Sequence, residues 1–234
     1  MRIVGMGYVR GLYIVMKRDL DRFWKYKWWL AGLITMNLTD LFIFALIFNN
    51  IINRAYISDY LLFLAPGITA IATFASAFSI GRILGGAVRG LIYQIPFILL
   101  LVILHGKLPT PVEAWTMVVT SIMLTISMSS LSIVISTAVR SFDLQATMRS
   151  FTYFVLFFFS NVFYPDSLIS RYFPQVLYIM ISNNPVSIAT SIYRGIFTPN
   201  ATTEDPLILL LKLAAWCIIF LVLGSIFYLR NLTR

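Results

Sequence analysis

The apolar residues of this chain gather into six long runs that are separated by short polar connections. The runs cover residues 28–52, 60–81, 83–104, 114–139, 147–164 and 206–229. Each is close to the length of about 20 residues that an α-helix needs to cross a bilayer at about 1.5 Å per residue. The pattern predicts an all-α membrane protein whose six transmembrane helices form one domain over residues 28–234.

The stretch before the last run is apolar but broken. Residues 172–193 carry no charge, yet they contain Pro174 and an Asn-Pro step at Asn184 and Pro185. Prolines interrupt the helical hydrogen-bond ladder, and polar side chains are costly at membrane depth. Irregular backbone is tolerated there only where protein or water covers it. We therefore predict a re-entrant outer helical hairpin over residues 165–194.

Residues 1–27 have the period of an amphipathic helix. Apolar side chains recur at steps of three and four residues: Val9, Leu12, Met16, Leu20 and Phe23. Within residues 8–27, which carry this period, Arg10, Lys17, Asp21 and Lys25 line another face. We expect this helix to lie in the cytoplasmic membrane interface and to lead into the first span. A soluble helix that packs on a partner is a compatible alternative.

Composition supports membrane insertion. Of the 234 residues, 59% are apolar and 12% are charged, and the mean hydropathy is +0.86. Soluble domains carry about 25% charged residues, so an ordinary soluble enzyme, a disordered chain and a disulfide scaffold are excluded. The net charge of +9 fits basic cytoplasmic loops better than a nucleic-acid partner.

The distribution of basic residues predicts a multi-pass protein of the cell membrane with both termini in the cytoplasm. With six spans, thirteen Lys and Arg residues fall inside and five fall outside. A seventh span across residues 172–193 gives the same tally. Charge alone therefore leaves six and seven spans open, and the broken character of this stretch favours six.

Motifs for chemistry on this chain are lacking. No phosphate-cradling G-x-x-x-x-G-K-[ST] loop is present, so the chain is not expected to hydrolyse ATP. A single His and a single Cys, far apart, argue against a metal site. The adjacent Glu204 and Asp205 lie in a polar loop and fit a solvated position. We expect no catalytic residue and no cofactor bound by this chain.

Polar residues inside the spans are the candidates for a translocation pathway. Asp40 lies near the middle of the first span, with Asn37 one turn earlier. A carboxylate there costs about 2.5–3.5 kcal/mol, so it should face the bundle interior or a wet cavity. Either a structural role or a role in substrate or proton passage would explain it.

The fourth span carries a stripe of hydroxyls on one helix face. Its members are Ser121, Thr125, Ser129, Ser132 and Ser136. Such a face turns toward other helices in lipid, as close packing or as the polar wall of a substrate path. Two glycine pairs, Gly81-x-x-x-Gly85 and Gly86-x-x-x-Gly90, indicate close helix packing or a hinge.

The order of several short motifs resembles the permease subunit of ABC type-2 exporters. Each motif is weak alone, but together they cover nearly the whole chain. The motifs are Phe63-Leu64-Ala65-Pro66-Gly67, Phe159-Ser160-Asn161-Val162-Phe163-Tyr164-Pro165, Tyr172-Phe173-Pro174, Asn184-Pro185 and Tyr193-Arg194. The amphipathic N-terminal segment matches this family as well.

The resemblance implies a function and partners. Such a permease pairs with a second copy, or with a related permease, and two separate cytoplasmic ATPase subunits with ATP and Mg drive it. It exports an amphipathic compound, a lipid or a lipid-linked polysaccharide. The residues that we expect to face the ATPase are Arg82, Arg89, Arg140 and Asp143. The alternative is a secondary transporter or channel that uses Asp40 as an ion or proton site; a membrane-embedded enzyme is less supported.

The connection between the second and third spans is unusually short. In the resembled family it is longer and carries a short helix that docks into the ATPase. We predict that a coupling segment is absent between about Ser79 and Arg82.

Overall fold

The structure is a computed structural model, and it describes residues 14, 17–18, 21, 24–25, 27–51, 57, 59–78, 83–139, 141–198 and 204–232. All regular elements in these residues are α-helices. The long ones are α2 (Lys27–Ile51), α3 (Tyr60–Phe78), α4 (Ile83–His105), α5 (Pro111–Ala138), α6 (Phe142–Phe158) and α10 (Pro206–Leu232). The short ones are α7 (Asp166–Tyr172), α8 (Gln175–Ser182) and α9 (Pro185–Phe197).

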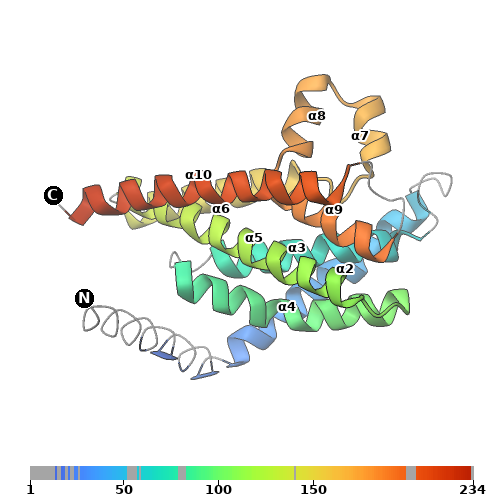
Figure 1. The fold of residues 1–234 in the computed structure, drawn as a ribbon, viewed down its shortest axis with the longest axis horizontal. Helices are drawn as coiled ribbons and strands as arrows, with labels where there is room; N and C mark the ends of the chain where they lie inside the picture. Colours follow the sequence, from blue (N-terminus) through green and yellow to red (C-terminus); the bar gives the residue numbers. More distant parts are fainter. Residues whose placement is uncertain are drawn as a thin grey trace.

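The long helices form one bundle, and α7 and α8 project from it near the start of α10 (Figure 1). Within the described residues, three helical stretches are long and apolar enough to cross a membrane: Tyr60–Phe78, Pro111–Ala138 and Pro206–Arg230. Shorter apolar stretches cover Ile34–Asn49 and Gly90–His105. The predicted all-α membrane class is confirmed, and the number of six spans stays a prediction.

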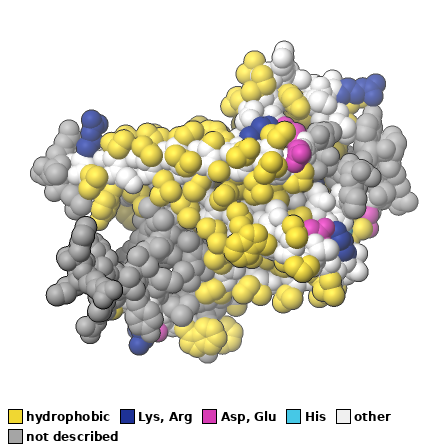
Figure 2. All heavy atoms as spheres, in the orientation of Figure 1, with side chains coloured by type: hydrophobic (Ala, Val, Ile, Leu, Met, Phe, Trp, Pro, Cys, Tyr) yellow, Lys and Arg dark blue, Asp and Glu magenta, His cyan; other side chains and the backbone are white. Residues whose placement is uncertain are grey.

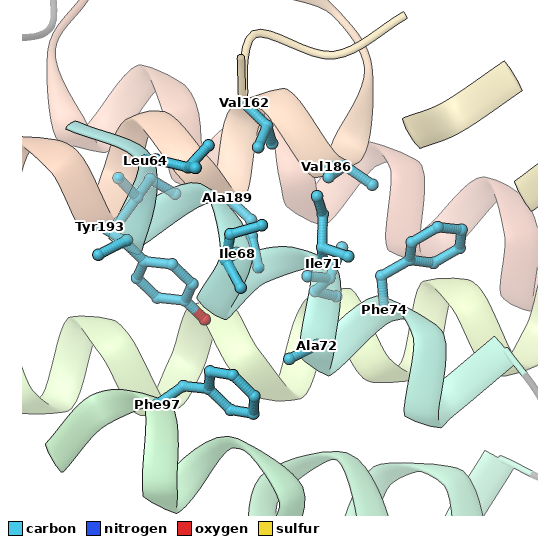
Figure 3. Close-up of a cluster of buried hydrophobic side chains, with 14 of the residues drawn as sticks. Leu64, Ile68, Ile71, Ala72, Phe74, Phe97, Val162, Val186, Ala189 and Tyr193 are labelled. Atoms are coloured by element: carbon cyan, nitrogen blue, oxygen red, sulfur yellow. The ribbon is translucent and has the colours of Figure 1, made fainter. Parts of the chain in front are cut away.

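Helix α3 forms the centre of the bundle. It packs against α4, α5, α9 and α2, and nearly all of its side chains are buried. Its many small residues allow this close approach. The hydroxyls of Thr69 and Thr73 donate to the carbonyls one turn earlier, Ala65 O and Thr69 O, at 2.9 Å. Figure 3 shows Ile68, Ile71 and Phe74 of this helix among side chains from α4 and α9.

The turn between α4 and α5 follows local rules. Gly106 has a φ of +60°, a conformation that glycine adopts without a steric cost. The next helix begins with a capping box, in which the Glu113 backbone N–H donates to the Thr110 hydroxyl and the Thr110 backbone N–H donates to the Glu113 carboxylate. Lys107 pairs with Glu113 at 2.8 Å and donates to Ile196 O, so the same turn also holds the end of α9.

Helix α10 packs on α5 and α9, and its outward side chains are mostly apolar. Figure 2 shows hydrophobic side chains along its length, with acidic and basic side chains mostly toward the end that carries α7 and α8. The exposed apolar residues include Leu211, Ile218, Val222 and Ile226. This surface has the chemistry of a face that contacts lipid.

Two predicted boundaries differ from the observed ones. The fifth run was expected at residues 147–164, but α6 ends at Phe158 and residues 159–165 are not helical, because side chains of α9 bond their backbone. The predicted hairpin over residues 165–194 contains three helices, α7, α8 and α9, where a pair was expected. Its re-entrant placement in the membrane stays a prediction.

Part of the sequence-based account lies outside the described residues. The helix expected over residues 1–27 is described only at a few positions, which are helical. Among them Ile14 and Trp24 are exposed. The short connection at residues 79–82 lies wholly outside the description.

Candidate functional site

Three parts of the sequence meet around Arg194 of α9. Its guanidinium donates to three backbone carbonyls: Phe63 O at 3.2 Å, Asn161 O at 2.8 Å and Val162 O at 2.7 Å. The guanidinium carbon also lies 3.7 Å from the centroid of the Phe63 ring. Arg194 is 2% exposed, so carbonyl dipoles and an aromatic face compensate the buried cation.

Asn161 is bound along one face of α9. Its backbone N–H donates to the Ser187 hydroxyl at 3.0 Å, its Nδ2 donates to the Ser191 hydroxyl at 2.8 Å, and its carbonyl accepts from Arg194. Ser187, Ser191 and Arg194 follow steps of four and three residues and therefore share a face. These bonds explain why the backbone leaves the helix after Phe158.

The other motif residues complete this arrangement. Asn184 caps α9 by accepting from Val186 N, and its Nδ2 donates to Leu156 O and Phe159 O at the end of α6. A Cβ on Gly67 would lie 2.7 Å from Val162 Cγ1, so only glycine allows this contact. We call the following residues the Arg194 cluster: Phe63, Gly67, Asn161, Val162, Asn184, Ser187, Ser191 and Arg194.

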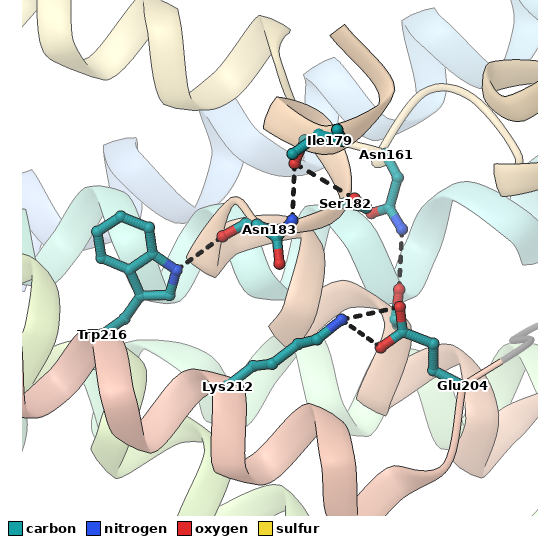
Figure 4. A network of polar contacts seen from close by, with 8 residues as sticks. Asn161, Ile179, Ser182, Asn183, Glu204, Lys212 and Trp216 are labelled. Atoms are coloured by element: carbon teal, nitrogen blue, oxygen red, sulfur yellow. Dashed lines mark hydrogen bonds and ion pairs between the residues drawn. The ribbon is translucent and has the colours of Figure 1, made fainter. Parts of the chain in front are cut away.

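A small polar cavity of about 20 Å³ adjoins the Arg194 cluster, large enough for one water. Its walls are Asn161, Asp166, Tyr178, Ser182, Ser191, Glu204 and Leu209. Asn161 Oδ1 is buried without a hydrogen-bond partner among the described residues. Figure 4 shows the ion pair of Lys212 with Glu204 and the hydrogen bond from Trp216 Nε1 to Asn183 O. These contacts connect α10 to the segment before it and to the turn between α8 and α9.

The predicted hydroxyl stripe of α5 lies buried among helices of the same chain. Ser121 Oγ lies 3.0 Å from the hydroxyl of Tyr193, which also accepts from Gln94 Nε2. Ser129 donates to Ala77 O of α3. Thr125 donates to carbonyls of its own helix, and Ser132 Oγ is buried without a partner in the described part of the chain. These positions provide close packing within one copy, and their role in a pathway stays a prediction.

Asn37 and Asp40 of α2 have different surroundings, although they are one turn apart. Asn37 is buried and donates to the Tyr93 hydroxyl of α4 at 2.8 Å. Asp40 is partly exposed, and no hydrogen bond or ion pair to another described residue forms at its carboxylate. It interacts electrostatically with Tyr153 of α6. Of the six predicted pathway residues, Asp40 is the charged one, and its carboxylate has no hydrogen bond or ion pair among the described residues.

The predicted ATPase-facing residues are only partly described. Arg82 and Arg140 lie outside the described residues, as does the side chain of Arg89. Asp143 is exposed in the first turn of α6. Its contact with an ATPase stays a prediction.

Sequence reasoning missed Gln145 and Arg149 of α6 and Ser187 and Ser191 of α9. Arg149 of α6 donates to the Ser136 hydroxyl of α5, and its Nε is buried without a partner within the described residues. Gln145 donates to Ser136 O and Val139 O and so caps the end of α5. The steps of four and three residues between Ser187, Ser191 and Arg194 were a signal for the shared face of α9.

No group of three or more His, Cys, Asp or Glu side chains among the described residues is placed to hold a metal ion. The buried polar groups bond mainly to backbone carbonyls and to one another, which suits a structural role in a membrane bundle.

Comparison with known families identifies the chain. The model of the ABC-2 type transporter family matches residues 74–198, more than half of the sequence. Curated proteins give no match to this chain. The matched region runs from the end of α3 through α9 and includes most of the Arg194 cluster. The chain therefore belongs to the ABC-2 type transporter family and is the membrane component of a transporter.

Proposed function

We propose that this chain is the transmembrane subunit of an ATP-driven exporter. Two copies form the pathway for an amphipathic compound, a lipid or a lipid-linked polysaccharide, and two separate ATP-binding-cassette subunits bind ATP and Mg and supply the energy. Family membership supports the class of transporter. The lack of a phosphate-binding loop in the sequence supports a separate ATPase.

The observation that carries this proposal is the incomplete cover of α6. None of its side chains is buried, although it directly follows α5 in the sequence and packs on it. Its exposed residues mix aromatic rings with polar groups: Asp143, Thr147, Ser150, Phe151, Phe154 and Phe158. We group these residues with Asp40 of α2, whose carboxylate has no hydrogen-bond or ion-pair partner among the described residues, and call the group the α6 surface.

The outward face of α10 provides the contrast. Both helices expose large side chains, but those of α10 are almost all apolar along the helix. Lipid can contact the outward face of α10 without desolvating polar groups. The polar groups of α6 and the Asp40 carboxylate are instead stable at membrane depth only in contact with protein or water. A second copy related by a two-fold axis would place the same surface against itself. A related permease in place of the second copy would serve equally.

The orientation places both termini in the cytoplasm, because basic residues are concentrated on that side. The turn between α5 and α6 then faces the ATPase, with Asp143 at its edge. Arg82, Arg89 and Arg140 belong to the same side of the membrane. We infer that these four residues form the ATPase-facing surface.

Purification with a candidate ATPase tests the proposal. The permease is co-expressed with the ATP-binding-cassette subunit encoded nearest to it, and the complex is isolated and its mass measured. We expect two permeases and two ATPases, with ATP hydrolysis that export substrates stimulate. An active complex with one permease would contradict the pairing. Ion flux without ATP would favour the secondary transporter or channel.

A further inference from the structure

Aromatic rings form a continuous series from one end of α3 to the other. Neighbouring ring centroids lie 5.0 to 6.1 Å apart. The rings come from α2, α3, α6 and the segment after α6, in this order: Phe78, Phe74, Tyr153, Phe157, Phe163, Phe44, Phe48, Tyr60 and Phe63. Since α3 has 19 residues, the series covers about 28 Å at 1.5 Å per residue, close to the thickness of the hydrocarbon core.

The series is not entirely enclosed in the core. Phe44, Phe48, Tyr153 and Phe157 are partly exposed, whereas Phe74 is buried. Apart from Phe63 of α3, the partly exposed rings belong to α2 and α6, the two helices that contribute the α6 surface. A ligand on this surface would therefore contact aromatic edges and faces along much of its depth.

Asp40 lies beside the middle of this series. It is one turn from Phe44 on α2, so the two side chains share a helix face. It also interacts electrostatically with Tyr153 across from it. Arg149, the one basic residue of α6, is directed toward α5, where it donates to the Ser136 hydroxyl. Among the described residues, Asp40 therefore carries the charge next to the rings that has no hydrogen-bond or ion-pair partner.

We propose that Asp40 and the aromatic series form one half of a binding site for lipophilic organic cations, completed by the second copy. The inference rests on the proposed exporter and names its substrate class. Aromatic faces attract cations, most strongly where water is excluded. A positive ligand also neutralises a carboxylate that is otherwise costly at this depth. The same carboxylate repels an anionic amphipath.

Two ions of nearly the same size and shape provide a direct test. Tetraphenylphosphonium and tetraphenylborate share four phenyl groups but differ in charge. Their binding is measured by equilibrium dialysis to the permease–ATPase complex in nanodiscs of zwitterionic lipid. We expect the complex to bind the phosphonium at least about tenfold more tightly than the Asp40→Asn variant does, a difference of about 1.4 kcal/mol. Borate binding should not weaken in that variant.

Two further variants control for folding and for charge. Asp205→Asn changes an exposed carboxylate that accepts from Leu207 N at 2.8 Å, and asparagine caps a helix equally well, so phosphonium binding should be unchanged. Asp40→Glu keeps the charge and should bind within about threefold of the wild type, roughly 0.7 kcal/mol. The Asp40→Glu variant also provides a test if Asp40→Asn does not fold. Loss of phosphonium binding in a folded Asp40→Glu complex would contradict the proposal.

Several outcomes would overturn the inference. They are equal binding of the phosphonium to the wild type and to Asp40→Asn, an equal weakening of borate binding in Asp40→Asn, or loss of binding in Asp40→Ala with full binding in Asp40→Asn. The last outcome would assign hydrogen bonding to a neutral amphipath. If the wild-type complex hydrolyses ATP but shows one of these results, the exporter stands and the cation site fails. If no ATPase purifies with the permease, the exporter itself fails.

Discussion

Arg194 and Asp40 are both charged residues in the membrane component, but their surroundings are opposite. Arg194 is buried, and carbonyls from α3 and from the segment after α6 accept its hydrogen bonds. Asp40 is partly exposed without a partner among the described residues. The first charge is compensated inside one copy of the chain. The second requires something that this copy does not supply.

The Arg194 cluster and the α6 surface are expected to affect different properties, stability in the first case and transport in the second. In the Arg194 cluster, loss of Arg194, Asn161, Ser187 or Ser191 leaves a buried hydrogen-bonding group without its partner. Such a group destabilises the fold. On the α6 surface, a substitution removes a group that one copy alone does not need. We therefore expect the first region to respond in thermal stability and the second in transport.

The largest loss of stability is expected for Arg194→Ala. Three buried carbonyls lose their donor, and each unsatisfied group costs about 1–3 kcal/mol, so we expect a total of about 3 kcal/mol or more. Arg194→Lys should recover only part of this, because an ammonium lacks the planar fork. Fluorescence-detected size-exclusion chromatography after heating measures the loss. Arg171→Ala, at an exposed arginine of α7, is the control and should melt like the wild type.

The next effect is expected where α4 meets α5. A Cβ on Gly90 would lie 2.2 Å from Thr125 Cγ2, so Gly90→Ala should destabilise the bundle by about 1–3 kcal/mol through overpacking. Thr125→Ser removes that methyl and should restore most of the melting temperature. Gly32→Ala is the matched control, since nothing lies within 4 Å of its Cβ position. Equal melting of Gly90→Ala and Gly32→Ala would contradict this packing.

A smaller effect is expected at the start of α5. Glu113→Ala removes half of the capping box and the ion pair with Lys107, at a cost of about 1 kcal/mol. Glu113→Gln can still accept from Thr110 N and should lose less than half of that. If the two variants melt at the same temperature, the capping bond contributes nothing.

The smallest effect on stability is expected for Asp40→Ala. The carboxylate has no partner to lose among the described residues. The free energy of unfolding should therefore change by no more than about 0.5 kcal/mol, as for neutral surface substitutions, and the melting temperature should stay close to that of the wild type. Export by the assembled transporter should fall by more than the amount of protein in the membrane. Normal export together with normal stability would make Asp40 dispensable.

The sequence predicted the helical class and the positions of most helices well. Apolar runs placed α2, α3, α4, α5 and α10 within a few residues of their observed bounds. Those helices are defined by local hydrophobicity, which periodicity and length record. Helix α6 was displaced, because its end depends on bonds from Asn184 and Arg194, which are distant in sequence.

The candidate site was predicted in part. The motifs from Phe63 to Arg194 were recognised by their order, and the structure brings residues of four of the five motifs into one cluster. The order of the motifs along the sequence does not predict that Asn161 lies at the centre of the cluster, because its hydrogen bonds depend on how α9 packs. The hydroxyls of α5 were placed on one face correctly, but only tertiary packing could tell that Ser121 and Ser129 contact helices of the same chain.

Cysteine cross-linking along α6 tests the central claim that a second copy covers the α6 surface. In a Cys217→Ala background, cysteines replace Phe151, Phe154 or Phe158 one at a time, and membranes are treated with a mild oxidant. We predict disulfide-linked dimers at one or more of these positions and none for Val222→Cys on the exposed face of α10. Cross-linking at Val222 with none along α6 would contradict the claim.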